Sequence, residues 1–223
     1  KKDMKKIAII GGTGKEGKGL AYRWAKHGHS VVIGSRSVEK AQIAADEINA
    51  LVTGDGKDKV VGLENSQAAD WCDYVVMTVP YEAHADMLCN LKEIIKGKIL
   101  IDVTVPLVPP KVHLVHVPKG GSAGLEAQAI LGDETPVVMA FQNISYERLF
   151  KENDIDCDVL VCGTSKQARE AVLELVREGG MTCWDAGPLA NSIVIEGLTS
   201  VLIYINKNYG SREAGIKITG VNR

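Results

Sequence analysis

The sequence has no long run of charge of one sign and no long apolar segment. Its 223 residues include 26 lysines and arginines against 28 acidic residues, for a formal net charge of −2 at pH 7. A concentrated basic patch for nucleic acid or acidic membranes is therefore not indicated. No stretch of about 18 consecutive apolar residues is present, and no cleavage-type site follows the N-terminal KKDMKK. We expect a soluble, cytoplasmic protein with no spanning helix and no signal peptide.

Cysteine and histidine are sparse, and neither is spaced for a metal site. The five cysteines include no Cys-x-x-Cys pair, which predicts reduced and mostly buried thiols. The five histidines include no i, i+4 pair, and His113 and His116 fall in a proline-rich segment. A zinc site there would need two more ligands that the sequence does not offer, so we expect no metal.

Short apolar runs alternate with helical patterns along most of the chain. Strands are expected at 6–10, 30–34, 60–63, 74–79, 98–103, 136–141 and 158–162, with 181–184 as a further edge strand. Helices are expected at 17–28, 37–50, 64–70, 82–96, 122–131, 165–179 and 191–208, with Ser37 as an N-cap. This alternation predicts an α/β protein with a doubly wound, mostly parallel sheet and right-handed crossovers.

A glycine-rich motif joins the first strand to the first helix. Gly12-Thr13-Gly14-Lys15-Glu16-Gly17 has the spacing G-x-G-x-x-G. In this context Gly12 permits a tight turn, Gly14 lets the main chain approach a pyrophosphate, and Gly17 lets the helix pack near the sheet. The free N–H groups at the start of the helix then face the phosphates. The motif predicts a dinucleotide-binding site.

The end of the second strand indicates which dinucleotide is bound. Enzymes that use NAD usually place a carboxylate there to hold the ribose hydroxyls. This chain has Ser35 and Arg36 instead, with Lys40 about one helical turn further on. A guanidinium can grip a 2′-phosphate that a carboxylate would repel. We therefore predict NADP(H) rather than NAD(H).

Residues at the ends of two later predicted strands, 74–79 and 98–103, border the expected ligand site, and Thr104-Val105-Pro106-Leu107 after the second could border the nicotinamide. Val79 ends the first of these strands and Pro80 follows it; both could form a wall beside the cofactor, because ligands of open parallel sheets lie outside the carboxyl ends of the strands. His84, on the following helix, faces the same region, although a lone histidine at a helix start is more often structural. The proline-rich loop 105–119 is too long for a minimal connection, and such loops are often functional.

Together these stretches resemble the coenzyme F420-dependent NADP reductases, the F420H2:NADP oxidoreductases. The glycine-rich motif and Gly34-Ser35-Arg36 are shared with many NADP enzymes, whereas Asp185-Ala186-Gly187-Pro188-Leu189-Ala190-Asn191-Ser192 and the Gly215-Ile216-Lys217 tail are more specific. The resemblance spans nearly the whole chain. It implies an NADP-binding Rossmann-type domain at 1–140 and a small C-terminal α/β portion at 141–223 that forms the substrate cleft.

The resemblance also implies the reaction and the residues of the site. A hydride would pass between the deazaflavin C5 of coenzyme F420 and the nicotinamide C4 of NADP, which needs no side-chain nucleophile. The residues implied to bind the cofactor are Gly12, Thr13, Gly14, Lys15, Glu16, Gly17, Ser35, Arg36, Lys40, Val79, Pro80, Tyr146 and Ala214.

Gln142 is a departure from the family pattern. Some members carry a histidine at this place, and a glutamine cannot carry charge near neutral pH. The departure bears on the identity of the hydride partner, so two alternatives stay open: an NADPH-dependent imine or carbonyl reductase, and a non-enzymatic NADP-sensing module. A ketone or imine acceptor would require a proton donor. Gln142, His84 and Tyr146 are the candidate catalytic residues, together with Lys217 for such a donor.

The last predicted helix, 191–208, is rich in apolar residues. One face should cover the sheet, and the remaining apolar surface suggests burial against a second subunit. A homodimer with two-fold symmetry and a helix wholly buried in its own chain are both compatible with the pattern.

Overall fold

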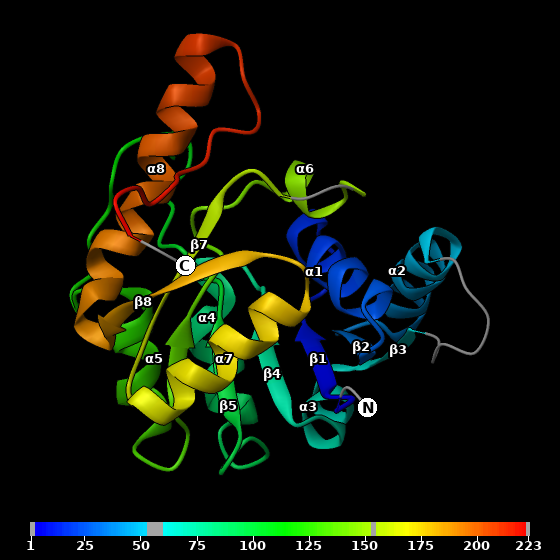
Figure 1. The fold of residues 1–223 in the computed structure, drawn as a ribbon. Helices are drawn as coiled ribbons and strands as arrows, with labels where there is room; N and C mark the ends of the chain where they lie inside the picture. Colours follow the sequence, from blue (N-terminus) through cyan, green and yellow to red (C-terminus); the bar gives the residue numbers. More distant parts are fainter. Residues whose placement is uncertain (1–2, 53–59, 153–154, 222–223) are drawn as a thin grey trace.

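The computed structural model describes residues 3–52, 60–152 and 155–221, and within them the strands form one eight-stranded sheet of order β3-β2-β1-β4-β5-β6-β7-β8 (Figure 1). The strands are β1 (Lys6–Ile10), β2 (Ser30–Ser35), β3 (Val61–Glu64), β4 (Tyr74–Met77), β5 (Ile99–Asp102), β6 (Val137–Met139), β7 (Asp158–Gly163) and β8 (Thr182–Pro188). Strands β1 to β6 are mutually parallel, β7 runs antiparallel to β6, and β8 is parallel to β7. The first six strands follow the Rossmann order, which confirms the predicted fold class.

The helices agree with the sequence pattern, apart from their ends and two short turns. They are α1 (Lys15–Lys26), α2 (Val38–Leu51), α3 (Asn65–Trp71), α4 (Tyr81–Leu91), α5 (Ala123–Leu131), α6 (Tyr146–Leu149), α7 (Lys166–Glu178) and α8 (Ser192–Tyr209), with the 3₁₀ turn η1 (Leu189–Asn191) before α8. Ser37 caps α2 as predicted, since its side chain accepts a hydrogen bond from the backbone N–H of Lys40. The sequence analysis missed α6, because one helical turn is too short to show a period.

Two hydrophobic layers cover the two faces of the sheet. Alternate residues of β1 point to opposite sides: Ile7 and Ile9 join one layer, Ala8 and Ile10 the other. The first layer receives side chains from α1, α2, α6 and α7, and the second from α3, α4, α5 and the first half of α8. Both faces of the central strands are therefore buried, as expected for a parallel sheet. All five cysteines are free and four of them are buried.

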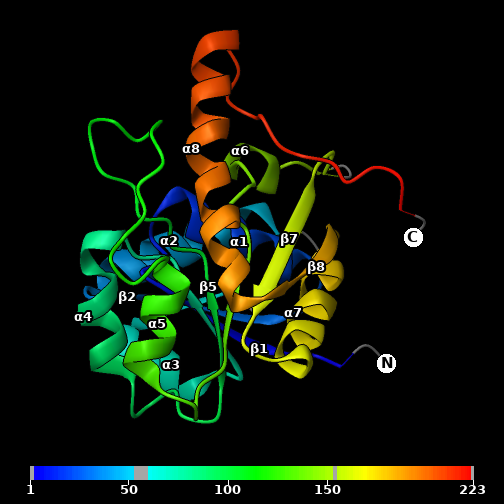
Figure 2. The ribbon, with the colours of Figure 1, turned by 90° about the vertical axis from the view of Figure 1, so that its left-hand side faces the viewer.

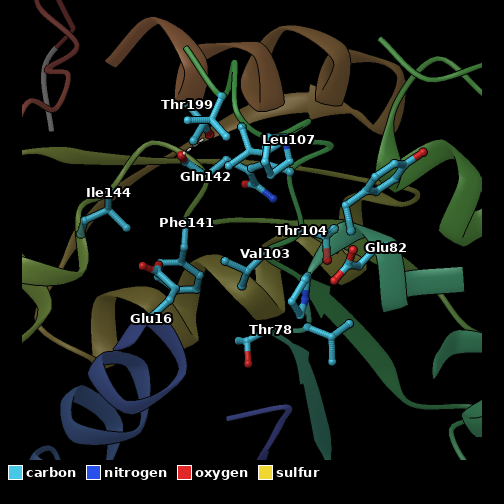
Figure 3. A pocket seen from close by; sticks show the side chains of 16 residues that line it. Glu16, Thr78, Glu82, Val103, Thr104, Leu107, Phe141, Gln142, Ile144 and Thr199 are labelled. Atoms are coloured by element: carbon cyan, nitrogen blue, oxygen red, sulfur yellow. Dashed lines mark hydrogen bonds between the residues drawn. The ribbon is translucent and has the colours of Figure 1, made fainter. Parts of the chain in front are cut away.

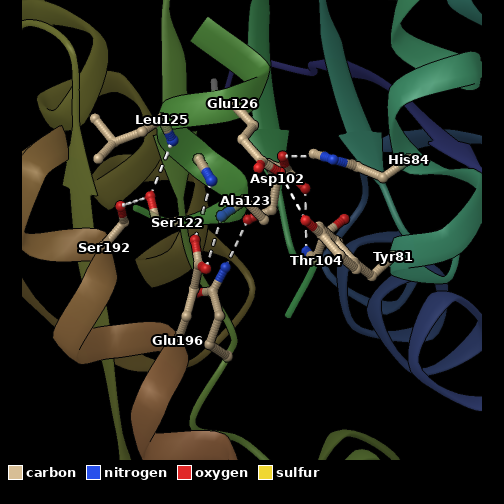
Figure 4. Close-up of polar contacts among 12 residues, drawn as sticks. Tyr81, His84, Asp102, Thr104, Ser122, Ala123, Leu125, Glu126, Ser192 and Glu196 are labelled. Atoms are coloured by element: carbon tan, nitrogen blue, oxygen red, sulfur yellow. Dashed lines mark hydrogen bonds and ion pairs between the residues drawn. The ribbon is translucent and has the colours of Figure 1, made fainter. Parts of the chain in front are cut away.

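Helix α8 packs on the body of the protein through polar residues. Glu196 is 3% exposed, and its carboxylate accepts hydrogen bonds from the backbone N–H groups of Ala123 (2.9 Å) and Gly124 (3.0 Å) at the start of α5. The hydroxyls of Ser122 and Ser192 lie 2.6 Å apart beside them (Figure 4). Burial raises the pKa of Glu196 to about 7, although the two N–H groups act in the opposite direction. These contacts fix the base of α8, while its C-terminal half projects away from the sheet (Figure 2).

By length and composition alone, the segment Leu189–Tyr209 could cross a membrane; an 18-residue window within it has a mean hydropathy of 1.4, and 33% of that window is buried. Core helices of soluble proteins pass the same test. We expected no spanning helix because the sequence has no uninterrupted apolar run of about 18 residues. Ser192, Glu196 and Ser200 interrupt this segment, but its average hydropathy remains high.

The sheet continues across residue 140, since Val138 and Met139 of β6 pair with Gly163 and Cys162 of β7. The two predicted portions, 1–140 and 141–223, therefore share one sheet. Their division into a cofactor-binding part and a cleft-forming part stays a prediction.

Candidate functional site

The glycine-rich turn between β1 and α1 depends on close backbone packing. A Cβ on Gly12 would lie 2.8 Å from the carbonyl oxygen of Ile9, and one on Gly17 would lie 2.7 Å from the Cα of Gly12. Both positions therefore need glycine for the fold itself. A Cβ on Gly14, in contrast, would meet nothing within 4 Å. The glycine at position 14 keeps open a space beside the first turn of α1, where no side chain caps the helix.

That open space fits a pyrophosphate. The first N–H groups of an α-helix have no partner within the helix, and the helix dipole favours negative charge there. Lys15 is exposed in the same turn, and its Nζ donates a hydrogen bond to the hydroxyl of Tyr146 (3.2 Å). Thr13 lies in the turn as well. The main chain and Lys15 can thus hold a dinucleotide across this end of the sheet.

The end of β2 carries exposed positive charge. Arg36 and Lys40 are exposed, and Ser35 is nearly buried with its Oγ accepting a hydrogen bond from the N–H of Ser37 (3.2 Å). An acidic residue is also close: Glu39 accepts a hydrogen bond from the Ser37 hydroxyl (2.8 Å), which lowers the pKa of Glu39. A ribose 2′-phosphate at this edge would meet Arg36 and Lys40 rather than a carboxylate at the strand end.

A cavity of about 460 Å³ opens beyond the carboxyl ends of β4, β5 and β6 (Figure 3). Its walls come from the residues that follow these strands, the first turn of α1, the proline-rich loop and α8. Val79 and Pro80 line it, and Val105, Leu107 and Pro109 contribute the wall from the loop. The loop 105–119 therefore forms part of the cavity wall.

Three residues that line this cavity each have a buried side-chain oxygen without a hydrogen-bond partner among the described residues. These oxygens are Oε1 of Glu16, Oγ1 of Thr104 and Oε1 of Gln142. Burial raises the pKa of Glu16 to about 8, so this carboxyl group is largely protonated at neutral pH. Because buried polar groups are normally hydrogen-bonded, these atoms indicate a site shaped for a polar ligand.

His84 lies outside the cavity. It is 1% exposed, and its Nε2 lies 2.6 Å from Oδ2 of Asp102, which is itself completely buried. Burial lowers the pKa of His84, but the Asp102 carboxylate and its hydrogen bond outweigh this effect, so the pKa is raised overall. The pair supports the cavity from behind, because Oδ1 of Asp102 accepts a hydrogen bond from the N–H of Thr104 (3.0 Å).

Tyr146 and Ala214 line a neighbouring cavity of about 320 Å³, which shares Glu16 and Gln142 with the first. The structure thus brings Lys15, Glu16, Gln142, Tyr146 and Ala214 to one region. Lys217 lies elsewhere, in an exposed ion pair with Asp156.

Sequence reasoning missed Phe141, Ile144 and Thr199, which also line the first cavity. Phe141 and Ile144 lie close to Gln142 in the sequence. Their closeness to the end of a predicted strand could have indicated that they line the site. Thr199 had no such signal, because only the packing of α8 brings it there. Within the described residues, no group of three histidine, cysteine or acidic side chains could hold a metal ion.

A Rossmann-ordered sheet with an open glycine-rich turn and a cavity at its strand ends defines a dinucleotide-binding protein. The chain belongs to the F420-dependent NADP reductase family. Residues 6–106 match the family model described as NADP oxidoreductase, coenzyme F420-dependent. The chain is 40% identical over 222 residues to the F420-dependent NADP reductase of Methanocaldococcus jannaschii, covering 97% of this chain and 99% of that protein.

One further relative and one solved structure are also similar to this chain. The F420-dependent NADP reductase of Methanothermobacter marburgensis is 39% identical, with the same coverage of 97% and 99%. A solved structure from Arthrobacter sp. FB24, described as a candidate F420-dependent NADP reductase, superposes with a TM-score of 0.78 at 24% identity, covering 96% of this chain and 99% of that one. At that identity the likeness shows the fold alone.

Gly14→Ala and Gly17→Ala should separate binding from folding. The Gly14 backbone (φ −77°) accepts an alanine, and its Cβ meets nothing, so stability should be unchanged while the dissociation constant for NADP rises about tenfold or more. Gly17→Ala should instead lower the free energy of unfolding by about 1–3 kcal/mol, because its Cβ has no room. Urea unfolding and calorimetric titration measure the two effects. Equal losses of stability in both variants would contradict the assignment of Gly14 to cofactor binding and Gly17 to folding.

Arg36→Asp should invert the preference between the two pyridine dinucleotides. Hydrogen bonds to charged groups contribute about 1.5–3 kcal/mol, so the affinity for NADP should fall about ten- to a hundredfold. The affinity for NAD should rise, because the new carboxylate can hold the ribose hydroxyls. The ratio of the two dissociation constants measures this change. Arg177→Asp, at an exposed arginine of α7, carries the same change of charge as a control; an unchanged ratio in Arg36→Asp would refute the assignment.

Proposed function

We propose that this protein transfers a hydride between NADP(H) and coenzyme F420 bound in the cavity over the nicotinamide. The observation that carries the proposal is the cavity of about 460 Å³ at the carboxyl ends of β4, β5 and β6, whose lining includes Glu16, two residues after the open position at Gly14. A dinucleotide that lays its pyrophosphate on this turn directs its nicotinamide toward the cavity. The cavity then offers space for a second planar ring.

The chain's own residues bind and position the two partners. The main chain from Gly12 to Gly17, with Lys15, holds the pyrophosphate, and Ser35, Arg36 and Lys40 hold the 2′-phosphate. Val79, Pro80 and the loop 105–119 exclude water from the rings. The nicotinamide supplies or accepts the hydride, so the protein's task is to hold both rings at reacting distance.

A reductase of imines or carbonyl compounds is the alternative enzyme. It would need a proton donor, and of the candidates His84 is enclosed with Asp102 and Lys217 lies outside the cavity. Glu16 favours this alternative, because its carboxyl group lines the cavity and its pKa is raised to about 8. An NADP-sensing module without activity is the third possibility.

Two assays distinguish the three candidate functions: the protein is mixed with NADPH and oxidised F420, or with NADPH and a cyclic imine. We expect the absorbance of the deazaflavin to fall as it is reduced, with turnover at catalytic amounts of protein. A cyclic imine should give no turnover. The opposite pattern would replace the proposal with the alternative enzyme, and tight binding of NADPH with no turnover on either substrate would leave the sensing module.

We also infer that the protein is a soluble, cytoplasmic homodimer that associates through α8. The polar residues of α8 are used inside the chain: Ser192, Glu196 and Ser200 are buried. Its outer face is apolar, with Val194 69% and Val201 46% exposed. The proline-rich loop extends this surface, because Ser200 donates a hydrogen bond to the carbonyl of Leu114 (3.2 Å), whose side chain is exposed. A second copy related by a two-fold axis would cover both apolar surfaces.

Val194→Glu should convert the dimer to a monomer without unfolding it. The new carboxylate would be buried between two copies of α8 without a partner, which is costly. Light scattering at micromolar concentration should give the mass of two chains for the native protein and of one chain for the variant. Ile43→Glu, at an exposed position of α2, should leave the mass at two chains. A native mass of one chain would refute the dimer.

A further inference from the structure

The side-chain amide of Gln142 has only one orientation that its surroundings allow. Gln142 is 5% exposed, and its Nε2 donates a hydrogen bond to the backbone carbonyl of Asp102 (2.7 Å). If the amide were turned over, Oε1 would face that carbonyl oxygen, and two acceptors would repel each other. Oε1 therefore points elsewhere; it has no hydrogen-bond partner in the described structure, and Gln142 is one of the residues that line the cavity. Gln142 offers the cavity an acceptor, not a donor.

The backbone around Gln142 is held in place. Its carbonyl accepts a hydrogen bond from the hydroxyl of Thr199 on α8 (2.5 Å). The preceding residue, Phe141, has φ +73°, in the left-handed region that side chains other than glycine rarely adopt. The Phe141 ring packs edge-on against Trp24, with centroids 5.7 Å apart, and this packing stabilises the strained turn. The acceptor is therefore presented from a fixed position (Figure 3).

Thr104 is anchored on the same residue as Gln142. Its N–H donates to Oδ1 of Asp102 (3.0 Å), while Oδ2 of Asp102 is paired with His84 (Figure 4). Thr104 is 4% exposed and lines the cavity, and its hydroxyl oxygen has no hydrogen-bond partner in the described structure. Asp102 thus anchors both residues, the side chain of Gln142 and the backbone of Thr104; one offers an acceptor and the other a hydroxyl that can donate.

We propose that Gln142 Oε1 accepts a hydrogen bond from an amide or imide N–H of the bound ring, while the Thr104 hydroxyl donates to the neighbouring carbonyl. The pair would fix the rotation of the ring in its own plane and so select rings with this edge. The inference rests on the proposed function, because two rings of that reaction carry such an edge: the carboxamide of the nicotinamide and the pyrimidine edge of the deazaflavin. Gln142 and Thr104 are specificity-determining residues in this scheme, and the His84–Asp102 pair positions them.

Analogues that lack the N–H test the inference. One is the 3-acetylpyridine analogue of NADP, in which a methyl replaces the amide nitrogen; the other is a deazaflavin methylated at its imide nitrogen. An acceptor left buried without a partner should weaken binding of one analogue to the native protein about tenfold relative to its parent. The analogue that is penalised identifies which ring the pair reads. Native protein that binds both analogues as tightly as their parents would overturn the inference without any variant.

Gln142→Met removes the acceptor while keeping the side-chain volume. In this variant the ratio of dissociation constants between analogue and parent should return to about one, because the partner of the missing N–H is gone. Gln167→Met, at an exposed glutamine of α7, should keep the native ratio. A penalty that persists unchanged in folded Gln142→Met would overturn the assignment to Gln142. Turnover of NADPH with F420 reports separately on the proposed function, since the inference can fail while that turnover is intact.

Discussion

The close approach of the backbone at Gly12 and Gly17 is the constraint on which the site depends. The two glycines let α1 start against the turn that ends β1, with no room for a side chain at either. This contact aims the first N–H groups of α1 at the space beside Gly14. It also places Glu16, in the first turn, at the cavity wall. A wider turn would separate the groups proposed to bind the pyrophosphate from the cavity.

Asp102 has a comparable role at the other side of the cavity. A completely buried carboxylate is costly unless its oxygens are satisfied. Here one oxygen faces His84 and the other accepts the N–H of Thr104, while the backbone carbonyl holds Gln142. The candidate acid–base residue His84 thus becomes part of the support for two cavity residues. Its Nε2 faces a buried carboxylate and is not offered to a ligand.

Much of the fold could be predicted because its signals are local. The apolar runs of β1 and β2, the N-cap at Ser37 and the glycine spacing each depend on neighbouring residues only. The glycine-rich turn and the residues after the strands could be assigned to one edge, since parallel strands end together. The resemblance to the F420-dependent NADP reductases, built on these and on the tail motifs, is confirmed by relatives that match nearly the whole chain.

The amino-acid sequence by itself determined the alternation of strands and helices, the glycine-rich turn and the absence of a carboxylate at the end of β2, because hydrophobic period and backbone freedom are properties of short segments. Only the tertiary structure decided how the side-chain amide of Gln142 is oriented, and that Thr199 of α8 donates a hydrogen bond to the Gln142 backbone carbonyl. It also decided that His84 is enclosed while Glu16 is left without a partner in the described structure. Such outcomes depend on which distant residues meet, and on the desolvation that follows when they do.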